Sequence, residues 1–257
     1  MSKALQPPKA KIIPKQLEKH GQIRTDDYYW LNERENPEVI DYLNKENEYY
    51  QQSTAHTKEF QKTLFEEMKA RIKEDDQSVP YLYNGYYYIT RFEKGKDYPI
   101  YARKKGNLKA SEEILFDCNE MAKEHTYFQM VGLSVSDDNQ WISFGIDTVS
   151  RRQYAIQIKN LVSGEILPTK LENTTGGATW SADNRTLFYT RKDETTLRSD
   201  TIYKHKLGSN PSDDVVVYHE KDETFDVSVF KSKSKKYIFI TSDSTMTTEY
   251  RMLFSAK

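Results

Sequence analysis

The chain has 257 residues, of which 37% are apolar and 13% aromatic, enough for the core of one large domain or two small ones. Its 38 Lys and Arg residues against 39 Asp and Glu residues leave a formal net charge of -1, which gives no general attraction for nucleic acid or anionic membranes. No apolar run approaches the roughly 20 residues that cross a bilayer, and the Lys- and Pro-containing start lacks the shape of a signal peptide. We therefore expect a cytoplasmic protein whose partners include neither nucleic acid nor a membrane.

Helices are the first elements that the sequence predicts. Asn36-Pro37-Glu38 supplies an N-cap residue, a proline at the first helical position and an acid in the first turn. Apolar residues then recur at steps of three and four, and a second run follows at strict four-residue steps, at Phe60, Leu64, Met68 and Ile72. The pattern predicts two helices within residues 37–73, or one helix with a break near residues 52–54.

A domain boundary is expected after this helical region. The acidic and polar stretch 73–78 ends in Val79-Pro80, which stops the helical pattern. Short runs rich in Tyr, Ile, Val, Phe and Thr follow, separated by Asn, Asp, Gly and Ser clusters that are typical of strands and turns. The first two strands flank Asn84-Gly85, a dipeptide suited to a two-residue hairpin because both residues tolerate positive φ. Residues 1–75 are thus predicted to form a helical arm, and residues 76–257 a β domain.

The β domain contains an internal repeat. Residues 133–144 align with residues 178–189, which places Val135 and Trp180 in equivalent positions 45 residues apart. A weaker third copy, residues 227–240, puts Val229 a further 49 residues on. A strand, a turn containing Ser and Asp, a second strand and a third strand, with a period in the forties, are typical of four-stranded propeller blades.

The predicted fold class is therefore all-β with a helical N-terminal arm, and the β part is an incomplete β-propeller. We assign the blades to residues 81–117, 133–172 and 178–218, with a fourth blade that starts at 226 and is truncated at the end of the chain. About three and a half blades cannot easily close a ring. The open sheet edges need either a partner or further sequence to cover them.

Motifs for chemistry are absent. The sequence has no G-x-S-x-G nucleophile elbow, no Walker loop and no G-x-G-x-x-G motif. Its five histidines are scattered without a second ligand at metal-binding spacing: His20, His56, His125, His205 and His219. Cys118 is interpreted as a small, half-buried residue beside a strand. We expect no catalytic, cofactor-binding or metal-binding residue in this chain, and no cofactor.

Several clusters have simple structural interpretations. The adjacent carboxylates Asp26-Asp27 and Asp137-Asp138 are interpreted as turn formers, because neighbours on a turn seldom converge on one substrate. Gly176-Gly177 is interpreted as a turn between blades. The basic run Lys231–Lys236 is interpreted as a solvated hairpin tip.

Arg151 and Arg152 are the candidate functional residues. They lie on a loop at one end of a blade, where two guanidinium groups could pair with carboxylates of another domain. We name them as candidate interdomain gate contacts. The alternative is that both are ordinary solvated surface residues.

The chain resembles the front part of the prolyl oligopeptidase family of serine peptidases, and within it the oligopeptidase B enzymes, also called protease II. The residues that carry the resemblance include His20–Leu31, with its D-x-Y-x-W-L element, residues 36–47 and Ser150–Tyr154. Residues 218–226 and 247–253 add further similarity.

The resemblance implies an enzyme with an α/β-hydrolase catalytic domain, capped by a seven-bladed propeller that follows an N-terminal arm packed on the catalytic domain. It implies cleavage of short peptides after Arg or Lys, with the propeller as a size filter. The catalytic triad has no matching positions in this chain, so the chain alone is expected to be inactive and to need the missing C-terminal catalytic domain as its partner. The alternative is a non-catalytic half-propeller that serves as an interaction module and assembles with a second copy.

Overall fold

The computed structural model describes residues 5–255, and the chain divides into two compact units, residues 1–73 and 74–257. The first unit opens with a hairpin of β1 (Lys15–Lys19) and β2 (Gln22–Asp26), joined by His20 and Gly21 at φ values of 55° and 72°. Two residues with positive φ form the turn that matches the twist of a hairpin. This hairpin is not predicted from the sequence, because its residues are nearly all exposed and show no apolar alternation.

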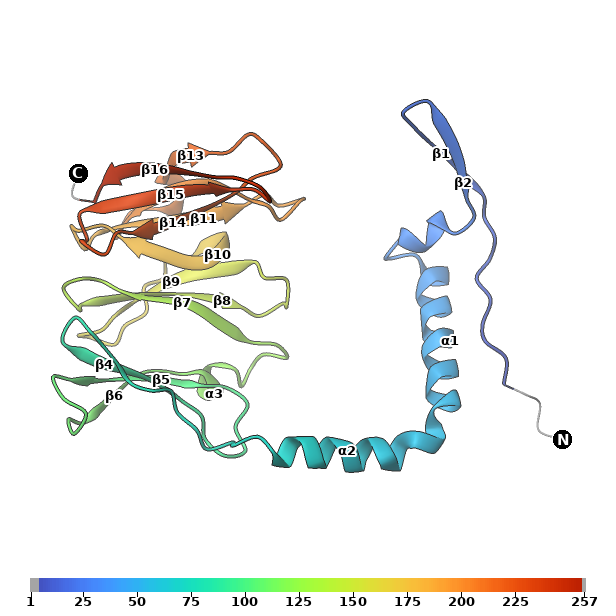
Figure 1. The fold of residues 1–257 in the computed structure, drawn as a ribbon, viewed down its shortest axis with the longest axis horizontal. Helices are drawn as coiled ribbons and strands as arrows, with labels where there is room; N and C mark the ends of the chain where they lie inside the picture. Colours follow the sequence, from blue (N-terminus) through green and yellow to red (C-terminus); the bar gives the residue numbers. More distant parts are fainter. Residues whose placement is uncertain (1–4, 256–257) are drawn as a thin grey trace. The chain divides into compact units, whose positions relative to one another are not determined.

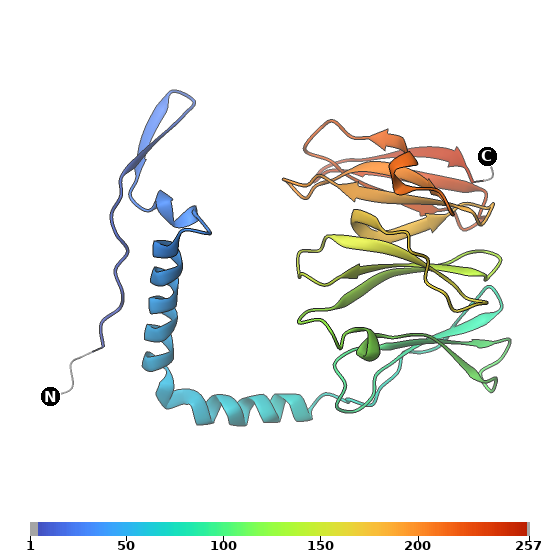
Figure 2. The ribbon, with the colours of Figure 1, turned by 180° about the vertical axis from the view of Figure 1, so that it is seen from behind.

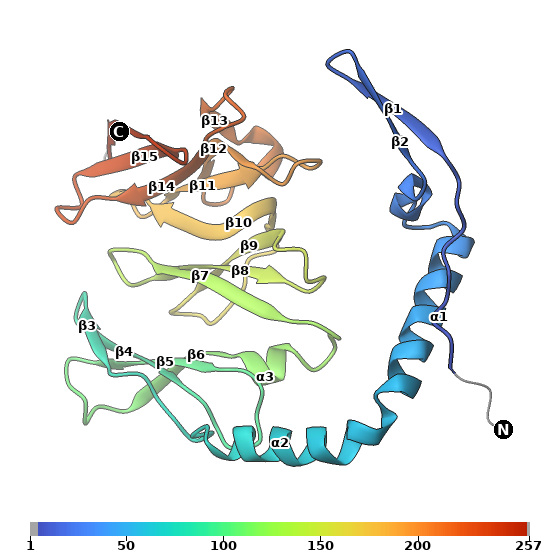
Figure 3. The ribbon, with the colours of Figure 1, turned by 45° about the vertical axis from the view of Figure 1, so that its right-hand side comes forward.

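Two helices follow a short 3-10 turn, η1 (Tyr29–Asn32). They are α1 (Pro37–Ser53) and α2 (Lys58–Ala70), with the 3-10 turn η2 (Ala55–Thr57) between them, and Figure 3 shows the chain changing direction there. The Asn36 side chain caps α1 by accepting the backbone N–H of Glu38 at 3.0 Å. The predicted cap and break are confirmed, and the second helix ends three residues before residue 73.

The second unit begins with a four-stranded sheet, the first blade. Its strands, in spatial as well as chain order, are β3 (Tyr81–Tyr83), β4 (Tyr86–Arg91), β5 (Ile100–Lys105) and β6 (Glu112–Asp117). Asn84 and Gly85 have φ values of 49° and 83°, so the predicted two-residue hairpin is confirmed. The short helix α3 (Cys118–Met121) leads away from this sheet.

The second and third blades form one continuous seven-stranded sheet. Its strands are β7 (Gln129–Val135), β8 (Trp141–Asp147), β9 (Tyr154–Asn160), β10 (Leu171–Trp180), β11 (Thr186–Lys192), β12 (Ser199–Lys206) and β13 (Val215–His219), in that spatial order. The 3-10 turn η3 (Pro211–Asp213) precedes β13. The first part of β10 pairs with β9 and its last part with β11, with register shifts near Thr174. One long strand therefore ends one blade and begins the next.

Gly176 and Gly177 lie inside β10, so their interpretation as a turn was wrong. The backbone of β10 passes directly against β7 and β8 at this point. A β-carbon placed on Gly145 would lie 2.4 Å from the Cα atom of Gly176, and one on Gly132 would lie 2.3 Å from the Gly176 carbonyl oxygen. These glycines permit main chain to approach main chain where two blades meet.

The fourth blade has three strands within the described residues: β14 (Asp226–Lys231), β15 (Tyr237–Asp243) and β16 (Thr248–Phe254). Figures 1 and 2 show the sheets of the second unit stacked face to face from residue 81 onward. The predicted fold class, a helical arm followed by about three and a half blades of an incomplete propeller, is confirmed.

The third copy of the repeat is aligned differently from our prediction. In each copy a Ser backbone N–H bonds to the carbonyl five residues on: Ser136 to Trp141, Ser181 to Thr186 and Ser232 to Tyr237. Lys231, and not Val229, therefore occupies the place of Val135 and Trp180. The error of two residues arose because Val227-Ser228-Val229 in β14 resembles Leu133-Ser134-Val135 of the second blade.

The core lies between the sheets. Phe116 of the first blade packs on Phe144 of the second with ring centroids 4.5 Å apart. Trp180, at the end of β10, is 1% exposed and donates its indole N–H to the carbonyl of Ser134 at 2.8 Å. The same faces that stack the blades therefore also bury the large side chains.

Candidate functional site

The loop that carries Arg151 and Arg152 is built around one buried carboxylate. Asp147, at the end of β8, is 1% exposed. Its Oδ1 accepts the backbone N–H groups of Val149 and Ser150 at 2.8 and 3.0 Å, and its Oδ2 accepts those of Arg151 and Arg152 at 3.0 and 2.7 Å. Four amide donors satisfy the carboxylate and fix the course of the backbone.

This loop presents the two arginines outward. Ser150 and Arg152 take φ values of 63° and 54°, and the Lys192 ammonium donates to the Arg152 carbonyl at 2.7 Å. Both arginine side chains are exposed, and within residues 5–255 neither forms an ion pair. The structure thus holds two guanidinium groups on a fixed backbone, and their role toward another domain stays a prediction.

A second charged site joins the turns of the second and fourth blades. We call Asp137, Lys231 and Lys235 the inner-turn cluster. The Asp137 carboxylate binds the Lys231 ammonium at 2.8 Å and the Lys235 ammonium at 2.9 Å. The interpretation of residues 231–236 as a solvated tip was therefore wrong for these two lysines, and that of Asp137 as a mere turn former was incomplete.

The electrostatics of the cluster agree with its geometry. Burial would raise the pKa of Asp137, but hydrogen bonds from the two ammonium groups outweigh it and hold that pKa below its usual range. The hydrogen bond to Asp137 raises the pKa of Lys235, whose ammonium also lies 5.3 Å from the centroid of the Tyr83 ring in the first blade. The Asn84 amide donates to the Asp137 carbonyl at 2.7 Å, so the turns of three blades meet here.

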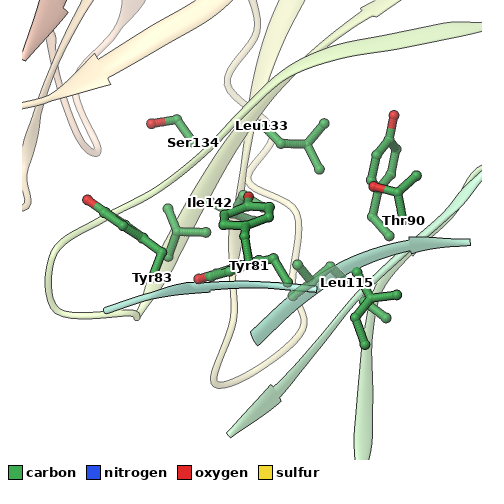
Figure 4. A pocket seen from close by; sticks show the side chains of 12 residues that line it. Tyr81, Tyr83, Thr90, Leu115, Leu133, Ser134 and Ile142 are labelled. Atoms are coloured by element: carbon green, nitrogen blue, oxygen red, sulfur yellow. The ribbon is translucent and has the colours of Figure 1, made fainter. Parts of the chain in front are cut away.

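A cavity of about 370 Å³ lies between the first and second blades (Figure 4). The side chains that line it carry no charge: four tyrosines, Thr90 and Ser134, and aliphatic residues that include Leu115, Leu133 and Ile142. Tyr81 stacks on Tyr88 with ring centroids 5.4 Å apart. Burial raises the pKa of both of these hydroxyl groups.

Two charged side chains near this cavity, Arg103 and Lys159, each make a polar contact with another residue. The Arg103 guanidinium, on a residue that is 3% exposed, binds both oxygens of Glu113 at 2.8 Å and lies over the Tyr86 ring. Lys159 crosses from the second blade and donates to the Leu115 carbonyl at 2.7 Å, and burial lowers its pKa. The Arg103 contacts lie within the first blade, whereas the Lys159 contact ties the second blade to the first.

His205 lies in a buried network of side-chain contacts. It is fully buried, its Nδ1 lies 2.7 Å from an oxygen of Asp214, and the Tyr189 hydroxyl donates to the other oxygen at 2.8 Å. Burial and this carboxylate raise the pKa of Tyr189 strongly. Tyr189, His205 and Asp214 are far enough apart in the sequence that no motif predicted their contact. Because the three side chains are buried together, we interpret them as a structural link between β11, β12 and the residue before β13.

Cys118 is 1% exposed, more deeply buried than the half-buried position that we predicted. Burial, followed by the charge of Asp117, raises the pKa of its thiol to about 12, so the reactive thiolate is scarce at neutral pH. In the part of the chain that the structure describes, no group of three metal-ligating side chains gathers at one point. No helix among residues 5–255 has the length and apolar character to cross a membrane.

The fold and these sites define an N-terminal arm followed by an open set of propeller blades. Residues 7–257 match the family model described as the prolyl oligopeptidase N-terminal β-propeller domain. The chain belongs to the prolyl oligopeptidase family of peptidases, within the N-terminal propeller part of that family.

Individual relatives agree with this assignment. Dipeptidyl aminopeptidase BI of Pseudoxanthomonas mexicana is 40% identical over 90% of this chain, and protease 2 of Moraxella lacunata is 36% identical over 96%. Oligopeptidase B from Leishmania major superposes on 99% of the chain with a TM-score of 0.90 and 30% identity. The chain spans 34% and 36% of the two curated relatives and 38% of the Leishmania enzyme, about a third of each.

Proposed function

We propose that the chain is the arm and the first half of the propeller of a serine oligopeptidase, with the catalytic domain supplied by sequence beyond these residues. The observation that carries the proposal is the similarity to oligopeptidase B over nearly the whole chain, at a TM-score of 0.90. The full enzyme would cleave by acyl transfer through a seryl intermediate stabilised by an oxyanion hole. We further propose a cytoplasmic location.

For substrates, we propose short peptides cut after Arg or Lys, with the propeller excluding longer chains. The relatives suggest a competing specificity, because one is a dipeptidyl aminopeptidase by name and another a protease. The gene product read to its natural stop codon should be assayed on an internally quenched peptide with a blocked N-terminus and one Arg, on a free-N-terminal dipeptidyl substrate, and on a folded protein. Cleavage of the blocked peptide alone supports the proposal, whereas release of dipeptides alone contradicts the specificity.

Arg151 and Arg152 would act as interdomain gate contacts in that enzyme. The proposal is supported by their outward presentation on a backbone that Asp147 holds with four hydrogen bonds. Replacing Arg151 by Ala in the full enzyme should change kcat/KM and weaken its dependence on salt concentration. Lys233→Ala, at an exposed position of another loop, is the control. If the salt dependence of kcat/KM is unchanged in Arg151→Ala, the proposed gate role is wrong.

An interaction module is the second candidate, and the outer face of the fourth blade favours it. Phe230, Tyr250 and Met252 are exposed there, on a sheet whose neighbour on that side is not among the described residues. A second copy could cover this face. Sedimentation velocity of the 257-residue chain decides, because a discrete dimer supports the module and a monomer excludes it.

A further inference from the structure

We propose that the cavity between the first two blades, together with the free edge of β3, binds an extended peptide segment and accepts one of its uncharged apolar or aromatic side chains. The inference rests on the proposed action on peptides and adds a binding subsite to it. A volume of about 370 Å³ falls within the range of ligand pockets, roughly 300–1,000 Å³.

The edge of β3 supplies the main-chain half of the site. This strand ends its sheet and pairs only with β4, so its other edge has no main-chain partner within residues 5–255. All three of its residues are exposed. A peptide that adds to such an edge as a further strand gains backbone hydrogen bonds, and adjacent pockets then select its alternate side chains.

The cavity supplies the side-chain half of the site. Tyr81 and Tyr83 project from β3 beside it, and Figure 4 shows Thr90 and Leu133 on other strands around the same space. The stacked rings of Tyr81 and Tyr88 offer an aromatic wall, which favours aromatic side chains through offset or edge-to-face contact. Hydroxyl groups of Thr90 and the tyrosines can satisfy a polar atom without a charge.

The surrounding charges exclude a basic side chain. Lys235 lies over the Tyr83 ring, and Arg103 is buried against the Tyr86 ring on the same strand as Tyr88. The acids near them are occupied, since Asp137 binds two lysines and Glu113 binds the Nε and Nη2 atoms of Arg103. A lysine or arginine entering the cavity would lose hydration and find no free carboxylate. The subsite therefore differs from a site that reads the basic residue at a cleavage point.

The test is an NMR titration of the ¹⁵N-labelled 257-residue chain with Ac-Ala-Phe-Ala-NH₂ and Ac-Ala-Lys-Ala-NH₂. We expect the Phe peptide to shift amide signals of β3 and β7 in a saturable manner, and the Lys peptide to bind at least 10-fold more weakly. N-methylation of the peptide amides removes the hydrogen-bond donors for the β3 edge, so it should weaken binding of the Phe peptide by a similar factor.

Three variants locate the site. Tyr81→Ala removes the aromatic wall and Thr90→Leu fills the cavity. Each substitution should weaken binding of the Phe peptide at least 10-fold. Tyr50→Ala is the matched control, because Tyr50 and Tyr81 are both 62% exposed and Tyr50 lies in the arm. Unshifted signals away from β3 and β7 show that each variant is folded.

Shifts that map elsewhere, equal binding of the Lys peptide, or unchanged binding by Tyr81→Ala and Thr90→Leu would overturn the subsite. Because binding is observed without hydrolysis, a chain that proves to have no role in a peptidase still gives a readable result. Conversely, if the full gene product has peptidase activity but the Phe peptide does not shift the amide signals of β3 and β7, the subsite proposal is wrong and the proposed peptidase function stands.

Discussion

Helix α2 of the arm and the sheets of the blades differ in how they place their apolar residues. The four-residue steps of α2 place Phe60, Leu64 and Met68 on one face, yet no residue of this helix is buried within its unit. The blades show weaker periodicity but bury Phe144, Ile156 and Ile158 completely. The apolar stripe of α2 is thus left exposed within its own unit, whereas the facing sheets of the first three blades bury their apolar residues against one another.

Removing one phenylalanine from each region should give the largest difference. Phe144→Ala creates a cavity between the first two blades and should lower the free energy of unfolding by about 3–5 kcal/mol. Phe60→Ala, at a side chain that is 69% exposed, should change it by less than about 0.5 kcal/mol. Urea denaturation of the 257-residue chain measures both. Equal losses would contradict the contrast between the two regions.

The crossing of β10 over its neighbours should be nearly as sensitive. Gly145→Ala forces a methyl group into the Gly176 backbone and should cost about 2–3 kcal/mol. Gly177→Ala is the matched control, because its nearest neighbour would be 4.0 Å away and its φ is not positive. A thermal melt in which both variants unfold at the wild-type temperature would show that the blades do not meet as described.

The inner-turn cluster should contribute less to the free energy of unfolding than Phe144 or Gly145, about 1–2 kcal/mol, because its charged groups are only partly buried. Lys231→Met should lower the stability of the chain, while Lys233→Met, at the exposed tip of the same hairpin, should leave it unchanged. Chemical denaturation at neutral pH compares the two. The interpretation fails if both lysines give the same result.

The same cluster predicts a pH dependence. The pKa of Asp137 is lower in the folded protein than in the unfolded chain, where it is about 3.9. Its contribution to stability is therefore present above the unfolded pKa and is lost as the pH falls through the lowered folded pKa. Asp137→Asn should flatten the acid limb of the stability curve relative to wild type. An identical acid limb in the variant would exclude Asp137 as its source.

The smallest expected effect concerns the thiol. Because Cys118 is buried and its pKa is raised to about 12, a thiol reagent should not modify the native chain at pH 7.5 and should react on unfolding in urea. Rapid modification of the native protein would show that the first blade is open at this point.

The sequence predicted the elements whose signals are local. The Asn36 cap, the Asn84-Gly85 hairpin and the Ser-containing turns of the second and third blades depend on residues within one turn of one another, so they were visible without the fold. The hairpin of β1 and β2 buries no apolar face, and a strand without a buried face carries no alternation to detect.

The parts that sequence reasoning missed depend on the stacking of blades. Asp137 and Lys231 are 94 residues apart and meet because their hairpin tips come together. Gly176 contacts Gly132 and Gly145 through packing that no dipeptide signal reports. Asp147 likewise organises the Arg151-Arg152 loop by accepting backbone N–H groups. Many carboxylates follow a strand in the sequence, so nothing in the sequence distinguished Asp147 from the others.

We propose that this chain is the arm and propeller part of a serine oligopeptidase whose catalytic serine lies outside these residues. The most direct test combines labelling with a fluorophosphonate, which reacts with activated serines, and hydrolysis of a blocked Arg peptide. The 257-residue chain should be neither labelled nor active, while the gene product read to its natural stop codon should show both labelling and turnover. Labelling or turnover by the 257-residue chain alone would contradict the account, because it would place the catalytic serine among the blades or the arm.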